Sequence, residues 1–254
     1  MKTIVVAQQK GGVGKTALAL HLAWFLTERK NSKVLFIDLD TQGNATYSLS
    51  GVKQIVGMGS GNLFSAGLTV TYDFSDSPLV LLPAGSMLAN IQNLSLQEAA
   101  SAFLSNFKAI KELGHFDYCV IDTPPSLGNA LAAALMAADF VVCPIEPETY
   151  SIQGIGQMAL TINNIRKINK NLTFLGLLPS KVDMRNPRHI KHLAQIKSQY
   201  GDYLIPVSIG LRSSIADAVA SSVPVWHIKR TAARKAAKEV NAVAEYIFTR
   251  MRGE

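Results

Sequence analysis

The sequence predicts an α/β fold in which a mostly parallel central sheet is covered by helices on both faces. Short runs that are apolar throughout alternate with helix-like runs along most of the chain, which is typical of parallel strands buried on both sides. A glycine-rich turn joins the first apolar run to the first helix-like run. The length of 254 residues and the hydrophobic share of 48% suit one domain with a substantial core. We therefore expect a single domain over residues 1–254.

The strands are assigned from the apolar runs. The first is predicted at residues 3–7, directly before the glycine-rich turn. Further strands are predicted at residues 32–38, 79–83, 116–122, 140–145, 172–178 and 203–207. A variable, loop-rich segment is predicted at about 45–80, because five glycines interrupt it: Gly51, Gly57, Gly59, Gly61 and Gly67.

The helices are assigned from apolar spacing and from their first turns. They are predicted at residues 17–28, 96–113, 127–138, 150–168, 187–200, 213–220 and 232–251. Pro187 suits the first turn of its helix, where its missing N–H has no partner to lose. The last helix carries one apolar stripe at i, i+3, i+4 and i+7 spacing, formed by Val240, Val243, Ala244, Ile247, Phe248 and Met251. We expect this stripe to pack on the core.

The glycine-rich turn has the features of a phosphate-binding loop. Residues 9–16 fill the pattern G-x-x-x-x-G-K-[ST], with Gln9 at the place of the first glycine. Glycines let the backbone wrap closely round an anion, and several N–H groups then converge on it at a helix N-terminus. Lys15 is expected to reach the β- and γ-phosphates, and the Thr16 hydroxyl to bind Mg²⁺. The expected nucleotide contacts are Gly11, Gly12, Val13, Gly14, Lys15, Thr16 and Ala17.

Three aspartates stand at the ends of predicted strands. Because the carboxyl ends of parallel strands meet at one edge of the sheet, we expect these side chains to lie near the glycine-rich turn. Asp122 follows an apolar strand, as the Walker B aspartate does, and is expected to hold Mg²⁺; its alternative role is to cap the following helix. Asp38 is expected to support Mg²⁺, and Asp40 to orient the attacking water.

Basic residues gather in the second part of the chain. The net charge of +7 divides into nine Lys/Arg against twelve Asp/Glu in residues 1–150, and sixteen against six in residues 151–254. A basic part with a charge balance of +10 indicates either a surface for a polyanion or an ordinary solvated surface. Charge by itself leaves these two readings equal.

Several stretches together resemble the ParA-type ATPases of the deviant Walker A (MinD/ParA/Soj) group. They are Lys10–Thr16, Ile37–Thr46, Val120–Pro125, Glu148–Gly154, Lys181–Asn186 and Ile209–Ala218. The resemblance covers nearly the whole chain. Two departures are Thr41, where the family usually has proline, and Gly210-Leu211-Arg212, where the family often has Ile-Pro-Arg.

The resemblance implies a P-loop ATPase that hydrolyses ATP with Mg²⁺ and forms an ATP-sandwich homodimer. Lys10 matches the family's signature lysine, which crosses the interface to the partner's ATP and there replaces an arginine finger. Lys10, Lys15 and Asp40 are thus the expected catalytic residues. Similarity also points to Lys181 and Pro206 as contacts near the adenine. Members of the group bind DNA without sequence preference in the ATP state and work with a ParB-like adaptor that stimulates hydrolysis.

The basic clusters supply the expected DNA contacts. Phosphate contacts of this kind give affinity that falls steeply with salt and carries no base information. The candidates are Arg185, Arg188, Arg212, Lys229, Arg230, Arg234, Lys235 and Lys238. No N-terminal helix-turn-helix domain is expected, because the phosphate-binding loop begins at once, and operator-specific binding by this chain alone is therefore not expected.

Three other functions compete with partition of plasmid or chromosomal DNA. A MinD-like positioning ATPase on a membrane needs an amphipathic C-terminal anchor separate from the last helix. A carrier of a metal cluster needs paired surface cysteines, whereas Cys119 and Cys143 lie in apolar strands and are expected to be buried thiols. A non-enzymatic nucleotide sensor would not need Lys10 and Asp40. With no secretory signal and no apolar stretch of about 18 residues, we expect a cytoplasmic protein, nucleoid-associated in the ATP state.

Overall fold

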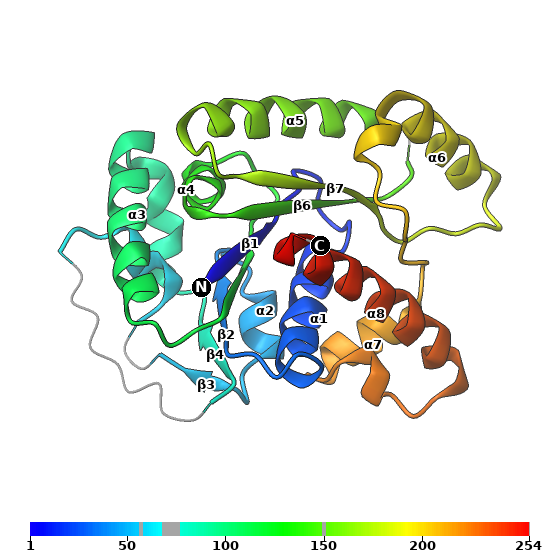
Figure 1. Ribbon diagram of the computed structural model, residues 1–254, viewed down its shortest axis with the longest axis horizontal. Coiled ribbons are helices and arrows are strands. Elements are labelled where there is room, and N and C mark those ends of the chain that lie inside the picture. Colours follow the sequence, from blue (N-terminus) through cyan, green and yellow to red (C-terminus); the bar gives the residue numbers. More distant parts are fainter. Residues whose placement is uncertain (56–57, 68–76, 149–150, 254) are drawn as a thin grey trace.

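The computed structural model describes residues 1–55, 58–67, 77–148 and 151–253. Within them, one parallel sheet contains seven strands in the order β3-β4-β2-β5-β1-β6-β7 (Figure 1). The strands are β1 (Lys2–Val6), β2 (Val34–Asp38), β3 (Lys53–Gln54), β4 (Leu79–Leu82), β5 (Tyr118–Asp122), β6 (Phe140–Ile145) and β7 (Thr173–Pro179). The predicted parallel α/β fold is confirmed.

Helices cover both faces of this sheet (Figure 1). They are α1 (Lys15–Glu28), α2 (Asn44–Ser48), α3 (Leu96–Glu112), α4 (Asn129–Ala137), α5 (Ser151–Ile168), α6 (Pro187–Tyr200), α7 (Ser213–Ala220) and α8 (Thr231–Arg252). Short 3₁₀ turns are η1 (Ser60–Phe64), η2 (Ser86–Asn93), η3 (Gly201–Tyr203) and η4 (Val225–His227). One core cluster joins the sheet to α3, α4 and α5, and the other joins it to α1 and α8.

Strand register brings the predicted site residues together. β5 lies between β1 and β2, with Val6 opposite Asp122 on one side and Asp38 opposite Asp122 on the other. The segments that leave these three strands therefore start side by side at one edge of the sheet. Ligands of open α/β sheets bind at this edge, so the register alone places the glycine-rich turn next to two carboxylates.

The ends of several helices follow from their capping residues. Ser95 accepts a hydrogen bond from the Glu98 N–H at 3.2 Å, while Glu98 accepts one from the Ser95 N–H at 2.9 Å, so α3 begins with a capping box. Asn186 accepts a hydrogen bond from the Arg188 N–H at 3.0 Å at the start of α6, with Pro187 in its first turn as predicted.

The apolar stripe of α8 packs on the core, as predicted. Val240, Val243, Ala244, Ile247 and Met251 are all buried in the cluster that this helix shares with α1 and the sheet. The two thiols are also buried and free as expected, and burial raises the pKa of both Cys119 and Cys143.

The strand predicted at residues 203–207 is wrong. Residues 201–203 form η3 instead, and Leu204 makes only an isolated bridge to Leu177. The Ile205 and Ile209 N–H groups each donate one hydrogen bond to β7, but Pro206 between them has no N–H to donate. The chain therefore runs along β7 without extending the sheet.

The segment at about 45–80 contains more regular structure than its glycines suggest. α2 begins at its start, and β3 and η1 lie within it, although residues 56–57 and 68–76 fall outside the described part. The predicted start of the 150–168 helix also falls outside it, and α5 is described from Ser151.

Candidate nucleotide-binding site

The glycine-rich turn joins β1 to the N-terminus of α1. Gly12 and Gly14 adopt φ values of 77° and 93°, a backbone conformation that residues with a side chain rarely take. Gly14 is the N-cap of α1, so the unpaired N–H groups of the first helical turn face the loop. A Cβ at Gly14 would also lie 3.1 Å from Ser180 Oγ in the loop after β7. The loop thus has the form that anion binding at a helix N-terminus requires.

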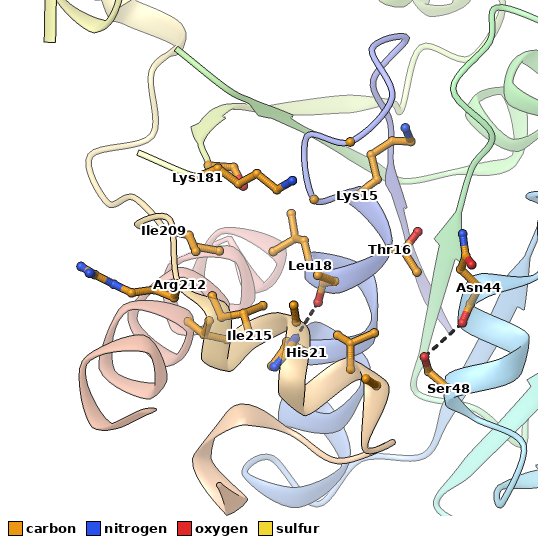
Figure 2. A pocket seen from close by; sticks show the side chains of 18 of the residues that line it. Lys15, Thr16, Leu18, His21, Asn44, Ser48, Lys181, Ile209, Arg212 and Ile215 are labelled. Atoms are coloured by element: carbon orange, nitrogen blue, oxygen red, sulfur yellow. Dashed lines mark hydrogen bonds between the residues drawn. The ribbon is translucent and has the colours of Figure 1, made fainter. Parts of the chain in front are cut away.

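A pocket of about 880 Å³ opens beside this loop. Figure 2 shows Lys15 and Lys181 near its upper end and His21 and Ile215 near its lower end, with Leu18 and Thr16 between them. Its walls come from five places in the chain: the glycine-rich turn with α1, the Asp40–Ser48 segment, Pro125, the loop after β7, and residues 209–220 with Val240. The predicted convergence of separate motifs on one edge is therefore present.

Lys15 is almost wholly buried in the loop. Its side chain is directed to the Lys10 carbonyl, with Nζ at 3.4 Å from that oxygen. Burial lowers the pKa of Lys15, while the nearby negative charges of Asp122 and Asp40 act to raise it. The ammonium group is thus held between the loop and two carboxylates. In this position it can donate a charge-assisted hydrogen bond to a phosphate bound in the loop.

Asp122 offers a free buried carboxylate oxygen. The residue is fully buried, and its Oδ1 accepts a hydrogen bond from the Thr123 N–H at 3.1 Å. Within the described residues, its Oδ2 has no hydrogen-bond partner. Burial, followed by the charge of Asp38, raises the pKa of Asp122 to about 7; contact with the Thr16 hydroxyl and the charge of Lys15 act the other way. A carboxylate oxygen without a partner beside a hydroxyl fits Mg²⁺, which prefers oxygen ligands.

Asp38 has a different environment, because both of its carboxylate oxygens are already engaged. Oδ2 accepts hydrogen bonds from the Thr46 N–H at 2.8 Å and the Thr46 hydroxyl at 2.7 Å. Oδ1 accepts one from the Asp40 N–H at 3.0 Å. Burial raises the pKa of Asp38, and the Thr46 hydrogen bonds oppose that rise. The Asp38 carboxylate therefore fixes the loop between Asp40 and Thr46.

Asp40 lines the pocket itself. Its Oδ1 accepts a hydrogen bond from the Gln42 N–H at 3.0 Å, and its side chain lies within the electrostatic reach of Lys15. Of the three strand-end aspartates, Asp40 is the one among the residues that line the pocket.

The Lys10 side chain pairs with Glu148 of the loop after β6. The hydrogen bond from Lys10 is the largest cause that lowers the pKa of Glu148, although burial acts to raise it. Lys10 therefore projects from the loop toward β6 rather than into the pocket of its own chain.

The far end of the pocket corrects one predicted contact. Lys181 lines the pocket as expected and adopts a positive φ of 54°. Pro206 is exposed and lies outside the pocket, because the chain after Leu204 follows β7 and turns inward only at Ile209. Ile209 and Gly210 form the wall where Pro206 was expected. The Val13 side chain is likewise buried in the protein, away from the pocket.

The basic residues expected to contact DNA divide into two groups. Three form ion pairs: Arg185 with Asp183 at 3.0 Å, Arg230 with Asp217 at 3.2 Å, and Arg212 with Glu239 at 2.7 Å. The others are exposed and form no ion pair with the described residues: Arg188, Lys229, Arg234, Lys235 and Lys238. Arg212 also points away from the phosphate-binding loop (Figure 2), and its side chain is part-buried in its pair with Glu239.

Sequence reasoning missed the partners of the site residues. Thr46 and Glu148 both lie in motifs that the resemblance had marked, so their positions carried a signal but their contacts did not. Ser180 directly precedes Lys181, which was expected to line the site. Glu239 lies on α8, where its sequence neighbours gave no sign that it reaches the pocket wall.

The sequence of this chain is similar to those of known proteins. A family model described as an AAA domain, AAA_31, matches residues 1–174. An Escherichia coli protein named IncC is 52% identical, over 99% of this chain and 70% of the relative. The chromosome-partitioning ATPase Soj of Thermus thermophilus is 33% identical, over 86% of this chain and 84% of the relative.

Solved structures are also similar to this chain in fold. A Cyanothece McdA variant in complex with ATP matches with a TM-score of 0.81 and 25% identity, over 98% of this chain and 96% of the other. Cobyrinic acid a,c-diamide synthase of Mycobacterium smegmatis, bound to an ATP analogue and magnesium, matches with a TM-score of 0.74 and 29% identity, over 98% and 94%.

Proposed function

This chain belongs to the ParA-type family of partition ATPases, and from that premise we propose that it couples ATP binding and hydrolysis to the partition of DNA. The observation that carries the proposal is the combination at one sheet edge of a phosphate-binding loop, buried Lys15, the free Asp122 oxygen and pocket-lining Asp40. Relatives named as partition ATPases, and neighbours solved with ATP or with an ATP analogue and magnesium, support it.

The glycine-rich turn holds the phosphates of the substrate ATP. Backbone N–H groups at the start of α1 and the Lys15 ammonium compensate their negative charge. Thr16 and Asp122 would hold Mg²⁺, which supplies further charge compensation when it is bound. Residues 209–213 and Lys181 form the wall available to the base and ribose.

Hydrolysis requires a water molecule placed in line with the bond that breaks. Asp40 is the pocket-lining carboxylate that can accept a hydrogen bond from this water. Water attacks the γ-phosphorus, the bond from that phosphorus to the β–γ bridging oxygen breaks, and ADP and phosphate are formed. Asp38 keeps the Asp40–Thr46 loop in place through its contacts with Thr46.

Lys10 accounts for a second property of the ATP state, which is the formation of a homodimer. In this chain Lys10 contacts Glu148, so its ammonium group lies outside the pocket of its own chain. A dimer formed across the ATP edge lets each Lys10 leave Glu148 and reach the phosphates of the partner's ATP. ATP then becomes part of the interface, and formation of the dimer therefore depends on bound ATP.

The exposed cations are the groups through which the dimer would bind DNA. Arg188 on α6, and Arg234, Lys235 and Lys238 on α8, have no ion-pair partner in the part of the chain that the structure describes. Such groups bind phosphates of any DNA sequence, with an affinity that falls as salt rises. A ParB-like adaptor that stimulates hydrolysis would then return the protein to its DNA-free state.

The membrane alternative receives no support from α8. Its apolar stripe is buried against the core and therefore offers no apolar face to a bilayer. None of the helices within the described ranges combines the length and the apolar character that crossing a bilayer requires.

One pair of binding measurements tests the proposal. Binding to non-specific duplex DNA and to anionic liposomes is measured with ATP and with ADP, at two salt concentrations. We expect DNA binding that depends on ATP and weakens with salt, and no binding to liposomes. ATP-dependent liposome binding without DNA binding would overturn the proposal in favour of the membrane alternative.

A further inference from the structure

A three-part contact joins the wall of the nucleotide pocket to α8. The Glu239 carboxylate accepts hydrogen bonds from Arg212 Nη2 at 2.7 Å and from Arg212 Nε at 3.2 Å. It also accepts one from the Gly210 N–H at 3.0 Å. About 29% of the Arg212 side chain and 20% of the Glu239 side chain are exposed, so solvent screens this two-pronged pair only in part.

The backbone around Gly210 is shaped to this contact. A Cβ at Gly210 would lie 2.8 Å from Arg212 Nη2, so a larger residue there would displace the guanidinium group. The same loop is tied to the loop after β7, since the Val182 N–H donates to the Ile209 carbonyl and the Leu211 N–H to the Val182 carbonyl, both at 3.0 Å. Residues 180–181 and 209–213 therefore form one connected wall of the pocket.

The other end of the contact lies among the unpaired cations of α8. Lys235 precedes Glu239 by one helical turn, and Lys238 is its neighbour in sequence. Both lysines are exposed, and neither forms an ion pair among the residues described. The carboxylate that receives Arg212 and Gly210 is thus on the same rigid helix as the cations proposed to bind DNA.

We propose that Glu239 is a positioning residue that couples the nucleotide pocket to the basic face of α8. Through Gly210 and Arg212 it fixes the pocket wall to the helix, so that nucleotide bound against the wall sets the position of Lys235 and Lys238. Arg212 acts in this contact and not as a DNA ligand. The inference rests on the proposed function of the pocket, because it assigns a route between the proposed ATP and DNA sites.

Glu239→Gln tests this role with little change of shape. The amide can still accept one hydrogen bond from Gly210 but loses the charge that holds Arg212. Loss of a negative charge beside two lysines favours DNA in every nucleotide state, so the readout is the ratio of DNA affinities with ATP and with ADP. We expect this ratio to fall at least ~5-fold, a typical lower value for coupling between two sites.

Glu245→Gln is the matched control. Glu245 lies on the same helix and pairs with Lys30 at 2.7 Å, so its substitution removes one charge and one ion pair away from the pocket wall. The ATP-to-ADP ratio should stay at the wild-type value in this variant. Arg212→Gln should lower the ratio as Glu239→Gln does, and the double variant should be no worse than either, because all three changes break one contact.

Hydrogen exchange provides a readout that does not need DNA. In the wild type, ATP should slow amide exchange in residues 231–245, and this effect should disappear in Glu239→Gln but persist in Glu245→Gln. The inference is overturned if folded Glu239→Gln keeps both the ratio and the exchange effect, or if ATP leaves α8 exchange unchanged in the wild type. If wild-type protein binds ATP with the exchange effect but binds no DNA, the proposed function fails while the coupling of the pocket to α8 stands.

Discussion

Lys10 and Glu148 form an ion pair that joins the glycine-rich turn to the loop after β6. The Lys10 side chain is 32% exposed and that of Glu148 is 46% exposed. Ion pairs with this much access to water contribute at most about 1 kcal/mol. The pair therefore holds Lys10 in its own chain weakly enough to allow the proposed transfer to a partner's ATP.

Glu148→Gln should favour the ATP dimer. Without the glutamate charge, both Lys10 side chains of the dimer leave their resting contacts at lower cost, and at most about 1 kcal/mol for each chain corresponds to a dissociation constant of the dimer that is lower by up to roughly 30-fold. Sedimentation velocity over a dilution series with a non-hydrolysed ATP analogue measures this constant. Glu146→Gln is the control, because Glu146 lies beside Glu148 but is not the partner of Lys10. Weaker dimerisation of Glu148→Gln would show that Glu148 supports the dimer instead.

Lys15→Ala and Asp40→Asn should separate binding from hydrolysis. Lys15→Ala removes the buried ammonium group beside the phosphate-binding loop, and binding of a fluorescent ATP analogue should be lost. Asp40→Asn keeps the shape but removes the carboxylate that places water, so binding should persist while ATP turnover falls at least ~100-fold. Normal turnover in Asp40→Asn would assign that role to another residue.

Acid should destabilise the protein through His21. Its Nδ1 lies 2.7 Å from the Ala17 carbonyl, and its Nε2 accepts a hydrogen bond from the Val225 N–H at 3.1 Å, so the folded ring is neutral. Burial lowers the pKa of His21 to about 4 from its ordinary value of 6.5. His21 therefore binds a proton below about pH 6.5 in the unfolded chain, but only below about pH 4 in the folded chain. About 2 kcal/mol of unfolding free energy should be lost between pH 6.5 and 5.

Urea unfolding of the wild type and of His21→Gln at pH 7 and pH 5 measures this loss. The variant should lose less stability between the two pH values, whatever its stability at pH 7. A wild-type His21 that titrates near pH 6.5 in an NMR experiment would contradict the account.

Gly176→Ala should destabilise the fold at the edge strand β7. Gly176 has a φ of 131°, and a Cβ there would lie 2.6 Å from the Tyr203 carbonyl oxygen. Because the obstacle is backbone, we expect a loss of at least about 2 kcal/mol in unfolding free energy. Gly156→Ala in α5 meets no atom within 4 Å and should instead add about 0.5–1 kcal/mol. Equal midpoints of thermal unfolding in the two variants would refute this.

Arg188→Gln should weaken DNA binding more than Arg185→Gln. Arg185 already pairs with Asp183, whereas Arg188 has no ion-pair partner in the described ranges. Loss of one phosphate contact should lower the slope of log affinity against log salt by roughly one. Titrations of labelled duplex DNA at several salt concentrations, with ATP present, give both slopes. A larger change for Arg185→Gln would mean that DNA displaces Asp183.

Secondary structure was largely predictable because most strands are buried on both faces and most helices carry a one-sided apolar pattern. The prediction failed at residues 203–207, where an apolar run includes Pro206. Whether an apolar run becomes a strand depends on hydrogen bonds to distant residues, which the local sequence does not encode. Leu204 makes only one isolated bridge, to Leu177 of β7. The 45–80 segment was under-predicted because α2 and β3 are too short for a periodic signal.

The sequence by itself determined the phosphate-binding loop, the strand-end aspartates and the basic second part of the chain. These features are local, since each requires particular residues at fixed spacing. Only the tertiary structure decided how the residues are used: Asp122 keeps a free oxygen while Thr46 occupies Asp38, and Glu148 holds Lys10. It also paired Arg212, which the sequence placed among the expected DNA contacts, with Glu239, 27 residues away in sequence. A side chain's role depends on which partners satisfy its charge, and folding selects those partners from distant parts of the chain.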